Sequence, residues 1–320
     1  MSAHIVTDLD RAARLAGVPA WDRYSLRSLP VPGGDLTFGV WEPAQESSLV
    51  TTVLALHGIT GNHRCWPYLV ERLPGARIIA PDLRGRGGSS EIEGPFGLSH
   101  HADDMVAVLD SVGVESAVVV GHSMGGYVGL VLADRHPDRV RSLVLVDGGL
   151  PLGGGVTDPE AEADRIIASL ANRLAMIFPS RASAVRFWRH HPAFEGAWTS
   201  VVEDYARYDL GGQAPRLRSR ASYASLIADS RDVHQGESLR RALSLLGRPD
   251  VEYPAQWLVA SHGLMNDIPA LYPPPVVVHW HETFPQLAIR PVNAVNHYTI
   301  VMSRRGAEAI ASAVRRVGRG

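Results

Sequence analysis

The sequence lacks several features that point to particular classes of protein. It contains no lysine among its 31 basic residues, and its formal net charge is only −2 at pH 7. A nearly neutral chain has no basic field to attract nucleic acid, and without lysine it cannot build a phosphate-binding P-loop. Cys65 is the only cysteine, so no internal disulfide can form. These absences argue against a nucleic-acid partner, a P-loop nucleotide hydrolase and a disulfide scaffold.

Long apolar runs are also missing. Residues 1–17 carry charges throughout and have no apolar core of signal-peptide length, and no other segment is long enough to span a bilayer. We therefore expect a cytoplasmic protein with no membrane partner, and the sequence leaves a homo-oligomer open. The 320 residues are 45% hydrophobic, which is enough for a well-formed globular core.

Residues 118–126, Val-Val-Val-Gly-His-Ser-Met-Gly-Gly, are the most informative stretch. The three β-branched residues predict a buried strand, and an apolar helix is expected to follow. Between them, Gly121, Ser123 and Gly125 match the G-x-S-x-G nucleophile elbow, a strained strand-to-helix turn that presents the serine hydroxyl. We therefore predict Ser123 as the nucleophile. The N–H of Met124 would begin the helix and serve as one oxyanion donor.

Together with the elbow, three further segments make the chain resemble the α/β-hydrolase superfamily. They are Leu-His-Gly at 56–58, Asp-Leu-Arg-Gly-Arg-Gly at 82–87, and Asn-His-Tyr-Thr-Ile at 296–300. Only the elbow is specific by itself, but the four segments occur in the family's order. The similar parts cover residues 54–146 and 256–320. The resemblance implies a serine hydrolase of the esterase or lactonase type, with a helical cap.

The alternation of apolar runs and turn signals predicts an α/β fold. Strand-like runs at 24–31 and 36–41 flank a turn cluster and suggest an antiparallel hairpin. Continuous apolar runs at 49–56, 77–80 and 143–146 suggest strands buried on both faces. This order predicts a mostly parallel, doubly wound sheet. The remaining expected elements are helices at 7–15, 65–73, 101–112 and 303–317 and strands at 256–261 and 287–292.

After residue 146 the alternation stops, and helical sequence continues to about residue 247. A capping signal at 157–160 opens this helical part. We predict three parts: residues 1–150 and 251–320 form the α/β-hydrolase core, and residues 151–250 form a helical cap or lid between them.

Aromatic residues are concentrated in the predicted cap. Any one of them could simply pack the cap onto the core, but together they suggest a pocket for a bulky apolar substrate. Trp188, Tyr205 and Tyr208 are the residues that we expect to bind it.

A serine hydroxyl needs a base within hydrogen-bond reach, and that base must be oriented by an acid. His297 follows the last predicted strand and precedes the last helix, which is where the resembled family places its base. His57, His122 and His262 lie in other segments. We therefore predict His297 as the base. We expect His57 to brace its own loop, the one that follows the Leu-His-Gly segment at 56–58.

Two aspartates are candidates for the triad acid. The family's usual slot has the form Gly-x-x-Asp, but here it begins at Gly263 and ends at Asn266, so Asp267 lies one residue late. An asparagine cannot stabilise the imidazolium of the transition state. Asp147 follows the predicted strand at 143–146, where a minority of the family place the acid. We favour Asp147 and keep Asp267 as the alternative.

The resemblance also assigns the remaining loop residues. The N–H of Ile59, directly after the His-Gly pair, is the second expected oxyanion donor. Asp82 and Arg84 are expected to support their loop and to take no part in the chemistry.

Nothing in the sequence implies a cofactor. The glycines around Gly85 and Gly153 lack the dinucleotide-binding fingerprint. His279 and His281 could lie on one side of a strand, but no carboxylate or cysteine pattern accompanies them, so we expect no metal site.

We therefore predict an enzyme that hydrolyses a carboxylic ester or lactone (EC 3.1.1 type) through a catalytic triad and an acyl-enzyme. Its partner would be a bulky hydrophobic small molecule, such as the macrolactone zearalenone. Because one fold hosts many functions, this substrate class rests on analogy. A carbon–carbon bond hydrolase uses the same triad and stays open. So does a hydrolase-like receptor that binds a small molecule with little turnover.

Overall fold

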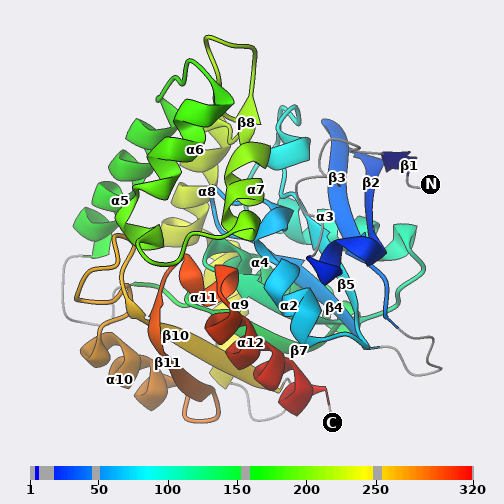
Figure 1. The fold of residues 1–320 in the computed structure, drawn as a ribbon. Helices are drawn as coiled ribbons and strands as arrows, with labels where there is room; N and C mark the ends of the chain where they lie inside the picture. Colours follow the sequence, from blue (N-terminus) through cyan, green and yellow to red (C-terminus); the bar gives the residue numbers. More distant parts are fainter. Residues whose placement is uncertain (1–3, 7–17, 45–50, 153–158, 248–253, 319–320) are drawn as a thin grey trace.

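The computed structural model describes residues 4–6, 18–44, 51–152, 159–247 and 254–318. The expected helix at 7–15, the first residues of the strand expected at 49–56 and the start of the capping signal at 157–160 fall outside these ranges. The described ranges form one central sheet with helices on both faces (Figure 1).

The central sheet has nine strands within the described ranges, in the order β1-β2-β3-β5-β4-β6-β7-β10-β11. The strands from β5 to β11 in this order are parallel to one another, whereas β1, β2 and β3 pair antiparallel. The predicted α/β fold with a mostly parallel sheet is therefore confirmed. The bounds are β1 His4–Val6, β2 Tyr24–Val31, β3 Gly34–Trp41, β4 Thr52–Leu56, β5 Arg77–Pro81, β6 Ala117–His122, β7 Val140–Val146, β10 Ala255–His262 and β11 Ala288–Asn296.

The predicted hairpin is formed by β2 and β3, with Tyr24 opposite Trp41 and Val31 opposite Gly34. Its turn contains Gly33, whose φ of 95° lies in the left-handed region that glycine adopts most easily. The hairpin therefore forms where its turn residues fit the backbone that a tight reversal needs.

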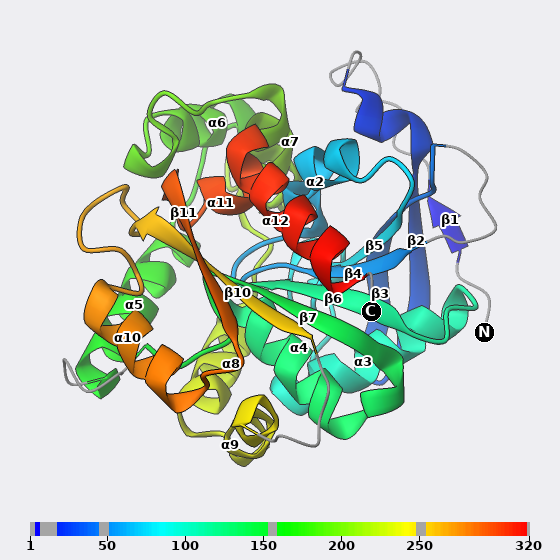
Figure 2. The same cartoon turned by 90° about the horizontal axis from the view of Figure 1, so that it is seen from below.

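The interior strands are covered on both faces, which explains their continuous apolar sequence. In β4, Leu54 and Leu56 pack toward one group of helices, whereas Val53 and Ala55 pack toward the other, and all four are fully buried. Figure 2 shows α2 and α12 on one side of the sheet and α3 and α4 on the other. The bounds are α2 Pro67–Arg72, α3 Leu98–Ser111, α4 Met124–Arg135 and α12 Arg304–Val317.

A helical segment separates β7 from β10, and we call its described part, residues 159–247, the insert. In Figure 1 its helices α5, α6, α7 and α8 lie together at the upper left, whereas α9 lies lower and contacts α4 of the core. Two short strands, β8 Leu210–Gly211 and β9 Arg218–Ser219, form a separate ribbon within it. The helices are α5 Pro159–Leu174, α6 Arg181–Arg189, α7 Ser200–Tyr208, α8 Tyr223–Gln235 and α9 Glu237–Leu243.

One helix of the second core part was not expected from the sequence. Residues Pro274–Thr283 form α10, which starts at consecutive prolines that favour the first turn of a helix. His279 and His281 lie on this helix and not on a strand. Residues two apart on a helix point in different directions, so these imidazoles do not share a side. Among the helices of the described ranges, none combines the length and apolar character needed to cross a lipid bilayer.

Candidate active site

Ser123 occupies a strained turn between β6 and α4. Its φ of 53° and ψ of −122° place a non-glycine residue in the positive-φ region. A Cβ atom at Gly121 would lie 2.3 Å from the Gly125 carbonyl oxygen, and a Cβ atom at Gly125 would lie 2.2 Å from the Leu56 carbonyl oxygen. Only glycine fits at these two positions, so the motif residues are required by the close packing of strand and helix.

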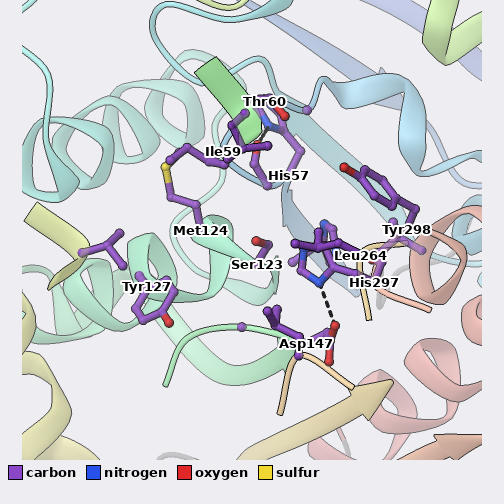
Figure 3. A pocket seen from close by; sticks show the side chains of 18 of the residues that line it. His57, Ile59, Thr60, Ser123, Met124, Tyr127, Asp147, Leu264, His297 and Tyr298 are labelled. Atoms are coloured by element: carbon purple, nitrogen blue, oxygen red, sulfur yellow. Dashed lines mark hydrogen bonds and ion pairs between the residues drawn. The ribbon is translucent and has the colours of Figure 1, made fainter. Parts of the chain in front are cut away.

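His297 and Asp147 form a buried pair beside this turn. The Nδ1 atom of His297 lies 2.7 Å from Oδ2 of Asp147, and a dashed line marks this bond in Figure 3. An ionised carboxylate only accepts hydrogen bonds, so Nδ1 carries the proton and Nε2 is left able to accept one. The other carboxylate oxygen of Asp147 accepts the Ala260 N–H at 3.0 Å. Asp147 is fully buried, and these two hydrogen bonds hold both of its carboxylate oxygens.

Ser123, Asp147 and His297 all line one cavity, and Figure 3 shows Ser123 between Met124 and His297. Within the described ranges, no hydrogen bond joins the Ser123 hydroxyl to His297. Such bonds are often long in unliganded enzymes and shorten when substrate binds. The structure therefore brings together the predicted nucleophile, base and favoured acid at one surface.

The alternative acid lies elsewhere. Asp267 lines a second cavity, and its Oδ1 accepts the N–H of Met265 at 3.3 Å. Asn266, which occupies the family's usual acid position, instead accepts a hydrogen bond from the Asn296 side chain at 3.1 Å. Asp147, and not Asp267, is therefore the carboxylate bonded to His297.

His122 supports His297 from another side. Its Nε2 donates to the carbonyl oxygen of His297 at 2.8 Å, and the two ring centroids are 4.7 Å apart. Burial and the nearby His297 charge lower the pKa of His122 well below its usual value. A neutral His122 can remain next to a His297 that becomes positively charged during a reaction.

His57 fixes the loop that follows β4. Its Nδ1 donates to the carbonyl oxygen of Gly58 at 2.7 Å, while Nε2 accepts the N–H of Leu83 at 3.0 Å. Burial lowers the pKa of His57 to about 4, so the ring stays neutral and keeps both bonds. Through these two contacts His57 braces the loop, and neither of its ring nitrogens is free for proton transfer.

Ile59 and Met124, the predicted oxyanion residues, line the same cavity and lie side by side in Figure 3. A fully buried arginine, Arg86, contacts both. Its Nε donates to the carbonyl oxygen of Ile59 at 2.7 Å, and its Nη2 lies 3.9 Å from the sulfur of Met124. The sequence did not single out Arg86, because an arginine between two glycines carries no local signal for the residues that its side chain contacts.

Arg86 forms an ion pair with Asp229 of α8. This pair links the insert to the core segment 82–87 that contains Arg86. Asp229 also accepts the N–H of Gly97 at 2.7 Å and Nε2 of His101 at 3.1 Å. Burial acts to raise the pKa of Asp229, but the charges of Arg86 and His101 outweigh burial and hold that pKa well below its usual value. The carboxylate is therefore ionised, as a buried arginine requires.

Asp82 and Arg84 hold their own segment in place, away from the cavity. Asp82 accepts Nδ1 of His63 at 2.9 Å and the hydroxyl of Tyr208 at 2.6 Å. Arg84 donates to both carboxylate oxygens of Asp104, at 2.7 and 2.6 Å. These buried pairs are structural contacts in the described ranges.

The three aromatic residues predicted to bind substrate occupy different places. Tyr205 lines the cavity at Ser123, whereas Trp188 and Tyr208 are not among the residues that line it. The Tyr208 hydroxyl is committed to Asp82, and Trp188 packs against His191 and Phe194. Of the three, only Tyr205 therefore lies where a substrate at Ser123 could touch it.

Two adjoining cavities meet at the site. The inner cavity, at Ser123, has a volume of about 120 Å³, and an outer cavity between the insert and the second core part has about 1170 Å³. Within the described ranges, no three His, Cys, Asp or Glu side chains gather in a way that could hold a metal ion. The residues common to both cavity linings are Leu152, Leu170, Leu264, Leu271 and Tyr298.

A family model described as alpha/beta hydrolase fold matches residues 51–248, more than half of the chain. The chain is an alpha/beta hydrolase. It is 42% identical to lipase LipV of Mycobacterium tuberculosis over 102 residues, which cover 32% of this chain and 39% of that protein. It is also 33% identical to a 2-hydroxymuconate semialdehyde hydrolase of Pseudomonas putida over 111 residues, 32% of this chain and 40% of that protein. The hydrolase thus matches less than half the length of these curated relatives.

The solved structures show the same fold at lower identity. E-2-(acetamidomethylene)succinate hydrolase has a TM-score of 0.70 and 22% identity, with 92% of this chain and 100% of that chain covered. A thioesterase domain from the curacin biosynthetic pathway has a TM-score of 0.69 and 19% identity, with 91% and 99% covered. At such identities the likeness establishes the fold alone.

We predict that replacing Arg86 by lysine lowers the kcat of the hydrolase by about 10- to 100-fold with a smaller change in KM. Lysine keeps a charge for Asp229 but cannot hold the Ile59 carbonyl at the same time, so the oxyanion loop loses its alignment. Steady-state kinetics measure the effect. Arg84→Lys is the matched control, since Arg84 is equally buried and paired but does not contact Ile59 or Met124. Equal losses of kcat in both variants would contradict the positioning by Arg86.

The free energy of unfolding is expected to fall as the pH is lowered from about 6.5 to about 4. The unfolded chain binds a proton at His57 with its usual pKa of 6.5, whereas burial lowers the folded pKa to about 4. Acid therefore favours the unfolded state, by about 3 kcal/mol for His57 alone. Urea unfolding at several pH values measures the slope. His122 adds to it with the same sign, whereas Asp209, whose folded pKa is raised by burial to about 6, opposes it between about pH 6 and pH 4.

The variant His57→Gln isolates this contribution because glutamine does not titrate. Its stability should fall less steeply over the same pH range, whereas His100→Gln, at an exposed position of α3, should keep the wild-type slope. Identical slopes in all three proteins would show that His57 does not cause the acid sensitivity.

Proposed function

We propose that this hydrolase cleaves a carboxylic ester or lactone with Ser123 as nucleophile, His297 as base and Asp147 as acid. The observation that carries the proposal is the 2.7 Å hydrogen bond between Asp147 and His297, beside a serine with a φ of 53° in the same cavity. A strained serine next to an oriented imidazole is the arrangement that nucleophilic acyl transfer requires.

In the proposed reaction, Nε2 of His297 takes the Ser123 proton as the hydroxyl oxygen attacks the substrate carbonyl. The protonated imidazole then gives that proton to the departing alkoxide, which leaves an acyl-enzyme. Water activated by the same histidine attacks the ester carbonyl and releases the acid. Asp147 stabilises the imidazolium throughout, since its buried carboxylate stays bonded to Nδ1. With a lactone the two product ends remain joined as a hydroxy acid.

Negative charge on the carbonyl oxygen would be stabilised by the N–H groups of Met124 and Ile59. The Met124 N–H opens α4, where unpaired amides and the helix dipole favour an anion. Arg86 holds the carbonyl oxygen of Ile59, in the peptide unit directly after the one that contains the Ile59 N–H. One such donor contributes roughly 3 kcal/mol to transition-state stabilisation in comparable sites. Rigid placement of this loop therefore contributes to the proposed catalysis alongside the triad.

The cavity volumes bear on substrate size. The inner cavity of about 120 Å³ is smaller than the roughly 300–1,000 Å³ of pockets that enclose drug-sized ligands. We therefore propose that only the part of the substrate nearest the scissile bond occupies it. The remainder would lie in the outer cavity of about 1170 Å³. A bulky ring such as that of zearalenone would have to extend across both cavities.

We also propose that the predicted helical part, residues 151–250, acts as a cap on the two core parts, 1–150 and 251–320. Leu170 and Tyr205 of the insert line the inner cavity together with the core residue Ser123. A substrate at Ser123 would then contact both parts of the protein. The insert would enclose the substrate at Ser123 during acyl transfer.

Hydrolysis of a carbon–carbon bond is the second candidate. It is favoured by the similarity to the 2-hydroxymuconate semialdehyde hydrolase over 32% of the chain. The same three residues would serve that reaction, so the substrate spectrum must separate the two activities. A receptor with little turnover is the third reading, and multiple turnover of any substrate would remove it.

The test of the proposed activity is a set of 4-nitrophenyl esters and lactones of increasing size, assayed with the wild-type protein and Ser123→Ala. We expect multiple turnover of at least one ester or lactone, and a loss of kcat of roughly a thousandfold or more in the variant. Circular dichroism shows whether the variant is folded. Retained activity in folded Ser123→Ala would rule out this nucleophile, and cleavage of vinylogous diketones alone would favour the carbon–carbon reaction.

The two aspartates should differ sharply when each is replaced by asparagine. We expect Asp147→Asn to lower kcat by roughly 10³- to 10⁴-fold, because the imidazole loses its tautomer and its stabilising charge. Asp267→Asn should change kcat by less than about threefold, because Asp267 bonds only to its own loop in the described ranges. Similar mild losses in both variants would mean that neither is the triad acid.

A further inference from the structure

Arg173 of α5 lies where the two cavities meet. It lines the outer cavity and donates a hydrogen bond to the hydroxyl of Thr60, a residue of the inner cavity. Leu170 precedes it by three residues on the same helix face and lines both cavities. The guanidinium therefore stands next to the predicted oxyanion loop, at the end of an apolar passage from Ser123.

The cation at Arg173 has no carboxylate partner among the residues that the structure describes. Its Nε atom is buried and makes no hydrogen bond within those ranges. Asp209 is close enough to feel its charge, since burial raises the pKa of Asp209 to about 6 and Arg173 opposes that rise. The Asp209 side chain, however, accepts its hydrogen bond from Ser219 at 3.0 Å. Arg173 is thus a cation with donor capacity left over.

The neighbouring Trp188 holds the guanidinium in place. The central carbon of Arg173 lies 5.1 Å from the Trp188 ring centroid, within the range of a cation–π contact. This contact and the bond to Thr60 restrict the side chain without neutralising it. A fixed arginine fork that keeps free N–H groups is well suited to binding a carboxylate.

The outer cavity as a whole has an excess of positively charged groups. Arg173 and Arg186 line it, while Asp267 is the one acidic residue among the described residues of its lining. His190 and His191 line it as well, but burial and the charge of Arg173 lower the pKa of His191, so the excess is carried by the two arginines. An anionic group would be favoured there and a cationic group disfavoured. The apolar residues shared with the inner cavity separate this region from Ser123.

We propose that Arg173 binds a carboxylate of the substrate in the outer cavity, so that the natural substrate is an ester or lactone with an apolar spacer and a remote carboxylate. The substrate class rests on the proposed hydrolysis, whereas the anion site rests only on the contacts of Arg173. Trp188 then affects substrate binding through the arginine that it supports.

Binding without turnover tests the anion site directly. Ser123→Ala protein would be titrated by calorimetry with monomethyl suberate, which carries one carboxylate, and with neutral dimethyl suberate, and then with the corresponding adipates and sebacates. We expect at least one monoester to bind about tenfold more tightly than its diester, and the added variant Arg173→Gln to abolish this preference. Arg173→Lys should retain part of it.

Arg181→Gln is the matched control, because Arg181 also belongs to the insert but lines neither cavity and bonds to the Arg207 carbonyl oxygen. It should keep the full preference for the monoester. The proposal is overturned if no monoester binds more tightly than its diester, if the preference survives Arg173→Gln, or if Arg181→Gln removes it equally.

A parallel kinetic experiment separates this proposal from the hydrolytic one. Protein with intact Ser123 would be assayed with mono-4-nitrophenyl suberate and with its methyl ester. A higher kcat/KM for the carboxylate, lost mainly through KM in Arg173→Gln, supports both proposals. Equal kcat/KM values that do not depend on Arg173 would support hydrolysis and refute the anion site. A binding preference without any turnover would support the anion site and refute ester hydrolysis.

Discussion

The hydrogen bond between Asp147 and His297 connects parts of the chain that are 150 residues apart. Asp147 directly follows β7, and His297 directly follows β11, the last strand along the described chain. Parallel strands bring both ends to the same edge of the sheet, where ligands collect in open α/β folds. The proposed chemistry therefore depends on correct pairing of β7, β10 and β11.

Buried charges link the insert to this edge. Arg86 touches the residues proposed as oxyanion donors, and its partner Asp229 belongs to α8 of the insert. Breaking such a pair leaves an uncompensated buried charge and typically costs about 3–5 kcal/mol. Arg173 makes a second link, from α5 to Thr60 of the same loop. Movement of the insert would therefore shift the loop that contains Ile59 and Thr60. This loop and the insert are thus mechanically coupled.

Much of the fold could be predicted because its signals are local. Continuous apolar runs mark strands covered on both faces, and the glycines at 121 and 125 mark a turn with no room for Cβ atoms. The contacts of Arg86 could not be predicted, because they depend on tertiary packing. Which of Asp147 and Asp267 bonds to His297 also needed the structure, since both follow strands that end at the same edge. Trp188 and Tyr208 show that aromatic content alone does not identify cavity-lining residues.

The central claim is that a strained Ser123, activated by the Asp147–His297 pair, is a working nucleophile. The most direct measurement is the intact mass of the folded protein after treatment with a fluorophosphonate, followed by peptide mapping of the modified residue. The account predicts one adduct per chain, located on Ser123 and formed much more slowly in Asp147→Asn. A folded protein that remains unmodified, or that carries its adduct on another residue, would contradict it.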